Sequence, residues 1–139
     1  MYWQPDMRPT IALIDADKNT RESLRALLAT LDANVTLYDS AERFLESGES
    51  VNCVVSDVSL PGLSGLQLLR QLRTGADHGG EQPNNDTPVI LMANESDVRT
   101  AVEAMRLGAT DFIEKQQLDV SLLRRVSQLL KNDREHTAH

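Results

Sequence analysis

Carboxylates and one lysine follow several short apolar runs of this sequence, and such residues together can carry phosphoryl transfer. Asp15 and Asp17 follow the first run, and Asp57, Glu95 and Lys115 follow later ones. Neighbouring carboxylates bind a hard divalent cation such as Mg²⁺ through oxygen. One carboxylate can also act as a nucleophile toward phosphorus, and a lysine ammonium can pair with a phosphoryl oxygen. Each residue alone is typical of a solvated turn, so the prediction depends on the set meeting in space.

The apolar runs are predicted to be strands of one parallel sheet, because longer segments of helical periodicity separate them. The expected strands are Thr10 to Ile14, Val35 to Tyr38, Val51 to Ser56, Val89 to Met92 and Asp111 to Ile113. In an open parallel sheet, ligands bind outside the carboxyl ends of the strands. The acidic residues and the lysine are therefore expected on a single rim.

Apolar residues at i, i+3, i+4 and i+7 predict amphipathic helices between the strands. Examples are Leu24, Leu27, Leu28 and Leu31, then Val98, Ala101, Val102 and Met105, and finally Leu122, Leu123, Val126, Leu129 and Leu130. A further helix is expected near Ser40 to Glu46. Five strands and five helices joined by right-handed crossovers give an α/β fold, a three-layer α/β/α sandwich.

Helix ends are also marked in the sequence. Asn19 with Glu22, and Ser64 with Gln67, have the spacing of a capping side chain and a residue that bonds back to it. Gly108 is expected to end a helix in a left-handed conformation.

Composition limits the function classes. The 139 residues correspond to one domain, with 40% apolar and 4% aromatic residues. A formal charge of −7, from 14 basic and 21 acidic residues, argues against direct nucleic-acid binding. The apolar runs are too short for a membrane helix, and the N-terminus lacks a signal-peptide pattern, so we expect no membrane association and a cytoplasmic location. The single cysteine, Cys53, excludes a disulfide within the chain and is expected to be buried.

The expected organisation is a flexible N-terminal segment over 1–9, one domain over 10–131 and a polar tail over 132–139. Residues 74–87 are rich in Gly, Asn and Asp and predict an extended loop, interpreted as a surface insertion.

Three segments resemble one known family. The run CVVSDVSLPGLSG over 53–65 resembles the phosphoacceptor segment of two-component response-regulator receiver domains, with Leu-Pro soon after the aspartate and Gly at the start of the next helix. Residues 104–115 are similar to the fourth helix, fifth strand and lysine of that family, and 10–17 to its first strand and acidic turn. The resemblance spans about residues 9–131, and its nearest branch joins the receiver to a helix-turn-helix DNA-binding domain.

The resemblance implies a flavodoxin-like receiver fold, with a five-stranded parallel sheet of order 2-1-3-4-5. It implies Asp57 as the phosphoacceptor, a sensor histidine kinase as donor, and Lys115 as the phosphoryl-binding residue. The implied Mg²⁺ ligands are Asp15, Asp57 and the backbone carbonyl of Ser59. Phe112 corresponds to the aromatic residue that changes rotamer on activation.

Three departures from the family pattern fall in this site. Ala16 stands where a second acid usually binds the metal, with Asp17 one residue further on as an alternative ligand, so Mg²⁺ binding is expected to be weak. Ala93 stands where the family usually has Thr or Ser, whose hydroxyl bonds the phosphoryl group and moves toward it on activation; alanine has no hydroxyl. Gln116 stands where the family usually has a proline that follows a cis peptide bond. A cis bond before a non-proline residue would cost about 3–4 kcal/mol. Phosphorylation-driven switching and a phosphorylation-independent interaction module both stay open.

Pairing of two copies is expected through the fourth helix, fifth strand and fifth helix, which carry charges of both signs. These charges are Arg99, Arg106, Arg124, Arg125, Asp97, Asp111 and Asp119. An enzyme alternative also fits the first acidic turn, which is similar to that of haloacid-dehalogenase-type phosphohydrolases, with Asp15 as nucleophile and Asp17 as acid/base. A docking domain without phosphate chemistry is a third alternative.

Overall fold

The computed structural model describes residues 8–75, 84–95, 98–117 and 119–137. Within these residues, five strands form one parallel sheet of order β2-β1-β3-β4-β5, which confirms the predicted fold. The strands are β1 (Thr10–Ile14), β2 (Asn34–Tyr38), β3 (Cys53–Asp57), β4 (Val89–Ala93) and β5 (Asp111–Glu114). The helices are α1 (Lys18–Leu28), α2 (Ala41–Ser47), α3 (Gly65–Thr74), α4 (Val98–Arg106) and α5 (Val120–Thr137). Short 3-10 helices follow α1 (Ala29–Leu31) and β5 (Lys115–Gln117).

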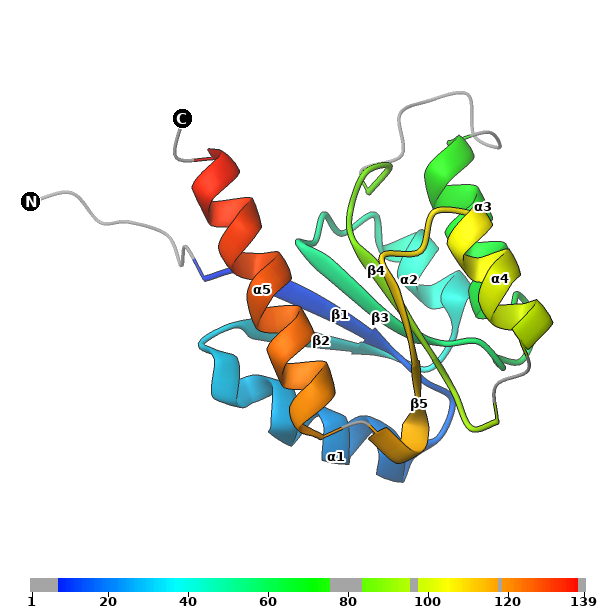
Figure 1. Cartoon of the computed structure of the whole chain (residues 1–139), viewed down its shortest axis with the longest axis horizontal. Coiled ribbons are helices and arrows are strands. Elements are labelled where there is room, and N and C mark those ends of the chain that lie inside the picture. The colour runs from blue at the N-terminus through cyan, green and yellow to red at the C-terminus, as the bar shows by residue number, and fades with distance from the viewer. Residues whose placement is uncertain (1–7, 76–83, 96–97, 118, 138–139) are drawn as a thin grey trace, which may run out of the picture.

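Two apolar layers cover the sheet, because successive strand residues point to opposite faces. In β1, Ile11 and Leu13 pack with residues of α1 and α5, whereas Ala12 and Ile14 pack with residues of α2 and α3. Figure 1 shows α1 and α5 on one side of the sheet and α3 and α4 on the other. Cys53 is fully buried, as predicted, and burial raises the pKa of its thiol to about 12.

The register of the sheet places the ends of its strands side by side. Ile14 pairs with Ser56, so the residues that follow them, Asp15 and Asp57, meet at one edge. On the other side of β3, Asp57 itself pairs with Met92 of β4. The acidic residues predicted for a common rim are thus brought there by strand pairing.

The helix ends confirm two of the three sequence signals. Ser64 and Gln67 form the predicted capping box at α3, and Gly108 adopts a φ of 100° after α4. The predicted cap at Asn19 is wrong. Asp17 caps α1 instead, because its Oδ2 accepts hydrogen bonds from the backbone N and Oγ1 of Thr20 at 2.8 and 2.6 Å.

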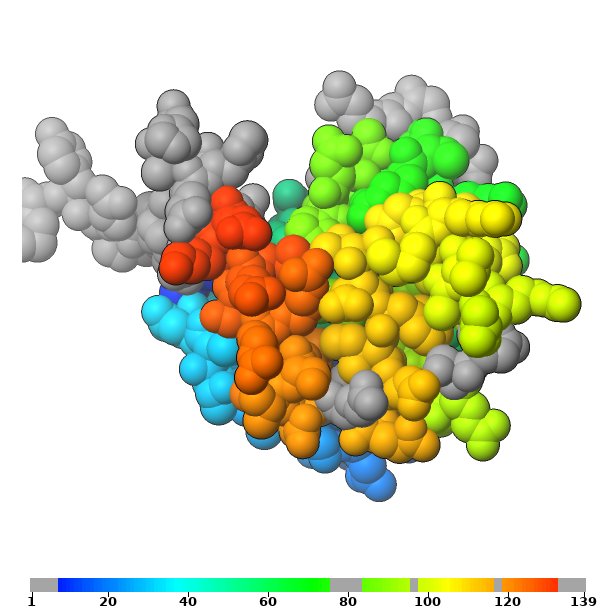
Figure 2. All heavy atoms as spheres, viewed as in Figure 1, coloured from blue at the N-terminus to red at the C-terminus, as the bar shows by residue number. Residues whose placement is uncertain are grey.

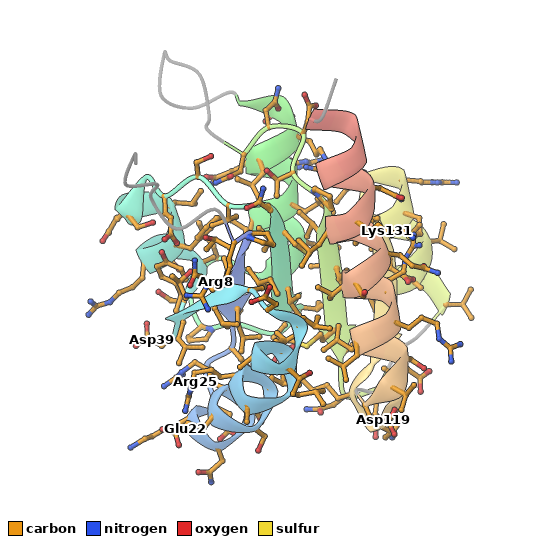
Figure 3. The ribbon with its side chains drawn as sticks, turned by 90° about the vertical axis from the view of Figure 1, so that its left-hand side faces the viewer. Arg8, Glu22, Arg25, Asp39, Asp119 and Lys131 are labelled. Atoms are coloured by element: carbon orange, nitrogen blue, oxygen red, sulfur yellow. The ribbon has the colours of Figure 1, made fainter. Side chains whose placement is uncertain are left out.

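The outer face of α1 is polar. Glu22 and Arg25 project away from the sheet (Figure 3), while Leu24 and Leu28 of the same helix are buried. This amphipathic division is the one that the leucine spacing predicted.

Two boundaries differ from the sequence prediction by more than one residue. The strand β3 begins at Cys53, because Val51 N donates to the side chain of buried Asn84 at 2.9 Å. Asn84 thereby anchors the far end of the expected 74–87 loop, of which residues 76–83 lie outside the described part. The helix α5 continues to Thr137, so most of the expected polar tail is helical. The expected N-terminal segment lies outside the described residues as far as residue 7.

No helix within the described ranges combines the length and apolar character needed to span a membrane.

Candidate functional site

Two buried carboxylates form the centre of the site. Asp57 is the last residue of β3 and Asp15 directly follows β1, and they expose only 6% and 1% of their surface. Buried carboxylates need compensating charge or hydrogen bonds. The partners of these two groups therefore define what the site can do.

Lys115 supplies that compensating charge. Its Nζ donates to Oδ2 of Asp15 and to Oδ2 of Asp57, both at 2.8 Å, and its side chain is 13% exposed. Gln116 does not prevent this contact. Lys115 and Gln116 lie in a 3-10 helix, and no peptide bond in the described part of the chain is cis.

The ammonium is held in its charged form by this arrangement. Burial alone would lower the pKa of Lys115, but hydrogen bonds and charge attraction from Asp15 and Asp57 outweigh it and raise the pKa above its ordinary value. At neutral pH a positive charge therefore faces both carboxylates.

Backbone amides hold the remaining carboxylate oxygens. Ser59 N donates to Oδ1 of Asp57 at 3.1 Å, and Asp17 N donates to Oδ1 of Asp15 at 2.9 Å. Each amide lies two residues after its aspartate, so the turns after β1 and β3 fix the orientation of both side chains. Arg21, in the first turns of α1, also donates to the backbone carbonyl of Asp15 at 2.6 Å.

Gly65, the last residue of the 53–65 motif, is required for close packing. Gly65 N donates to Val58 O at 2.8 Å, and a Cβ at Gly65 would overlap the carbonyl oxygen of Asp57. The Gly in the sequence motif thus lets α3 begin directly against the strand end that carries Asp57.

Asp17 is not joined to the central pair. Its carboxylate is used to cap α1, and hydrogen bonds from Thr20 lower its pKa. Ala16 is exposed between the two acids. Among the described residues, no group of three or more His, Cys, Asp or Glu side chains is arranged to hold a metal ion.

The positions expected to switch lie on β4 and β5. Ala93 ends β4, is 7% exposed and contributes no hydroxyl. Phe112 is half-buried on β5 and packs against the α2–α3–α4 side of the core. Glu95 is exposed beyond the end of β4, and Ser59 is exposed beyond Asp57.

The donor set is all oxygen, which is the ligand chemistry of Mg²⁺. Asp15 and Asp57 each accept one bond per carboxylate oxygen from the protein, and an ionised carboxylate has further acceptor capacity. The two carboxylates therefore have acceptor capacity left for a Mg²⁺ ion that completes its coordination with water.

This fold is that of a known family. The model of the response regulator receiver domain matches residues 11–127, and the chain belongs to this family. The transcriptional regulatory protein FixJ of Bradyrhizobium diazoefficiens is 43% identical over 107 residues, which are 76% of this chain and 48% of FixJ. The C4-dicarboxylate transport transcriptional regulatory protein DctD of Pseudomonas aeruginosa is 37% identical over 91% of this chain and 26% of its own length. The chain thus spans about half the length of FixJ and less of DctD.

Solved structures show the same fold. A beryllofluoride-activated DrrB receiver domain superposes with a TM-score of 0.78 at 30% identity, covering 90% of this chain and 99% of DrrB's. A crystal structure titled FixJ-N superposes with a TM-score of 0.75 at 31% identity, covering 90% and 95% of the two chains.

The sequence did not point to Arg21 or to Glu42, whose carboxylate reaches the loop after Asp57. Both lie in the first turns of amphipathic helices, where charged residues are typical of a solvated face.

Proposed function

We propose that Asp57 accepts a phosphoryl group from a sensor histidine kinase and that this changes the association of the chain with other proteins. The observation that carries the proposal is the buried Asp57 carboxylate held between Lys115 and the Ser59 amide. An oxygen of Asp57 would form a bond to phosphorus while the phosphorus–nitrogen bond of the donor phosphohistidine breaks and its electron pair returns to the imidazole. The product is an aspartyl phosphate.

Lys115 is placed to stabilise the aspartyl phosphate as well as the unphosphorylated site. Its ammonium already lies within hydrogen-bond distance of Asp57, and it can pair with a phosphoryl oxygen after transfer. Asp15 keeps that ammonium in place from the other side.

Asp15, Asp57 and the Ser59 carbonyl would hold Mg²⁺. When bound, the ion neutralises charge on the incoming phosphoryl group. With Ala16 in place of a second acid in the turn, the affinity is expected to be on the order of millimolar.

Homodimerisation through α4, β5 and α5 is part of the proposal. Figure 2 shows β5 between α4 and α5 on one face of the molecule, where Val102 and Met105 of α4 are exposed. The charges are not all available to a partner, because Arg125 Nε lies 3.2 Å from Asp111 Oδ2 within the chain. Asp97 lies outside the described residues.

A second candidate function is an interaction module that works without phosphorylation. It is favoured by Ala93, which ends β4 without the hydroxyl through which the family couples phosphorylation to a conformational change. The haloacid-dehalogenase alternative required Asp17 as an acid/base group, whereas the Asp17 carboxylate caps α1.

Intact-mass measurement after treatment with acetyl phosphate and Mg²⁺ separates the two candidates. The proposal predicts one added phosphate in the wild type and none in Asp57→Asn. A wild-type chain that never gains phosphate would support the interaction module, and turnover of a generic phosphate monoester would support the hydrolase. Sedimentation with and without beryllofluoride then tests pairing, which should weaken with added salt.

A further inference from the structure

The loop between β3 and α3 is anchored to the sheet at its first residue, and the start of α3 is bonded back to that residue. Val58 N donates to Met92 O at 2.8 Å, and Gly65 N donates to Val58 O at 2.8 Å. Ser59, in the first part of the loop, donates its amide to Asp57. Displacement of this loop would therefore move a hydrogen bond to the proposed phosphoacceptor.

A carboxylate from another helix holds the middle of this loop. Glu42 lies in the first turn of α2, and its Oε2 accepts a hydrogen bond from Leu63 N at 3.0 Å. Leu63 is 21 positions away in sequence, so this bond joins α2 to the loop that follows Asp57.

The loop is shaped to receive this side chain. Gly62 has a φ of 76°, and a Cβ at this position would overlap Oε2 of Glu42. The glycine thus serves two purposes, since it adopts the left-handed conformation and lets the carboxylate lie against the loop backbone.

The contact between Glu42 and Leu63 leaves one oxygen of Glu42 in an unfavourable environment. Oε1 of Glu42 is buried, and no described residue donates a hydrogen bond to it. A buried oxygen without a donor is unfavourable, and only part of that cost is offset by placing negative charge in the first turn of a helix. A solvated surface glutamate would not be held in this way.

We propose that Glu42 is a positioning residue for the phosphoryl site. By fixing Leu63 it restrains the loop, and thereby keeps the Ser59 amide on Asp57. The inference rests on the proposed role of Asp57 for its catalytic consequence, but not for the restraint on the loop itself.

The test compares Glu42→Ala with Glu42→Gln. Alanine removes the acceptor for Leu63 N, whereas glutamine keeps an acceptor oxygen at nearly the same place. Glu46→Ala is the matched control, because Glu46 is an exposed residue of the same helix. Each variant is examined by amide hydrogen exchange without metal and by the rate of phosphate addition to Asp57 from acetyl phosphate.

In Glu42→Ala, exchange should become faster at Ser59 as well as at Leu63, and phosphorylation should slow by about tenfold, as is typical when a residue that orients a ligand is lost. Glu42→Gln should restore both properties, and Glu46→Ala should leave both unchanged. A general loss of stability would instead speed exchange in the central strand β3 and would not be rescued selectively by glutamine.

Unchanged exchange at Ser59 in Glu42→Ala would overturn the inference, and so would faster exchange confined to Leu63 with an unaltered phosphorylation rate. If the wild type takes up no phosphate, the proposed function fails, while exchange at Ser59 still decides whether Glu42 restrains the loop.

Discussion

Nζ of Lys115 lies 2.8 Å from Oδ2 of Asp57, although the two residues are 58 positions apart in sequence. The same ammonium contacts Asp15 at an equal distance, so a single cation balances two buried carboxylates. A buried ion pair contributes little net stability when it is intact, but loss of one partner leaves uncompensated buried charge.

Lys115→Met should therefore destabilise the fold. We expect the free energy of unfolding to fall by about 3 kcal/mol without a divalent cation, and by less when Mg²⁺ is present. Urea denaturation measures both values. Lys131→Met, at an exposed lysine of α5, is the control. Equal denaturation midpoints for the two variants would contradict the geometry of the site.

The raised pKa of Lys115 makes stability depend on alkaline pH. The folded-state pKa lies above the ordinary value of 10.5, so the ion pair contributes fully below that value and its contribution is lost as pH rises through the folded pKa. Urea midpoints measured from about pH 10 to about pH 12 should fall more steeply in the wild type than in Lys115→Met. Parallel slopes would show that Lys115 is not held by the carboxylates.

The strands and the rim were predictable because local patterns encode them. Continuous apolar runs mark strands buried on both faces, and β4 matches its predicted run except for Ala93 at the end. The residues after β1, β3 and β5 could then be assigned to one edge. Ser64 and Gln67 predicted their helix start for the same reason, since a capping box depends on residues three apart.

The choice between two nearby caps, and contacts between distant segments, were not predictable in the same way. Asp17, rather than Asn19, caps α1, because the turn after Asp15 brings its carboxylate to Thr20. Glu42 was missed because its partner is a backbone amide of a loop, and a backbone amide leaves no mark in the sequence. The position of Lys115 depended on the path of the chain through Gln116, which only the structure shows.

Ala16→Asp should tighten Mg²⁺ binding. Ala16 is exposed beside Asp15, so a carboxylate can be accommodated there and adds an anionic ligand. We expect affinity to rise by roughly tenfold, equivalent to about 1.4 kcal/mol, and phosphorylation of Asp57 to become faster. Amide shifts near Asp57 during Mg²⁺ titration measure the affinity. If the wild type binds equally tightly, Asp17 or another group already supplies the missing ligand.

Ala93→Thr should change how phosphorylation affects association and should not change Mg²⁺ affinity. The residue ends β4 and is nearly buried, so an added hydroxyl lies at the edge of the sheet that carries Asp57. Mg²⁺ affinity should stay within about twofold of wild type, a difference of less than 0.5 kcal/mol, while phosphorylation should change sedimentation more strongly than it does in the wild type. A wild type that already changes association on phosphorylation as strongly as the variant would show that the hydroxyl is dispensable.

The most direct measurement is to locate the phosphate on the chain. After treatment with acetyl phosphate and Mg²⁺, borohydride reduces an aspartyl phosphate to homoserine, and peptide mass spectrometry identifies the converted residue. Our proposal predicts conversion at Asp57 alone, with none in Asp57→Asn. Conversion at Asp15 or Asp17, or retained conversion in Asp57→Asn, would contradict Asp57 as the phosphoacceptor.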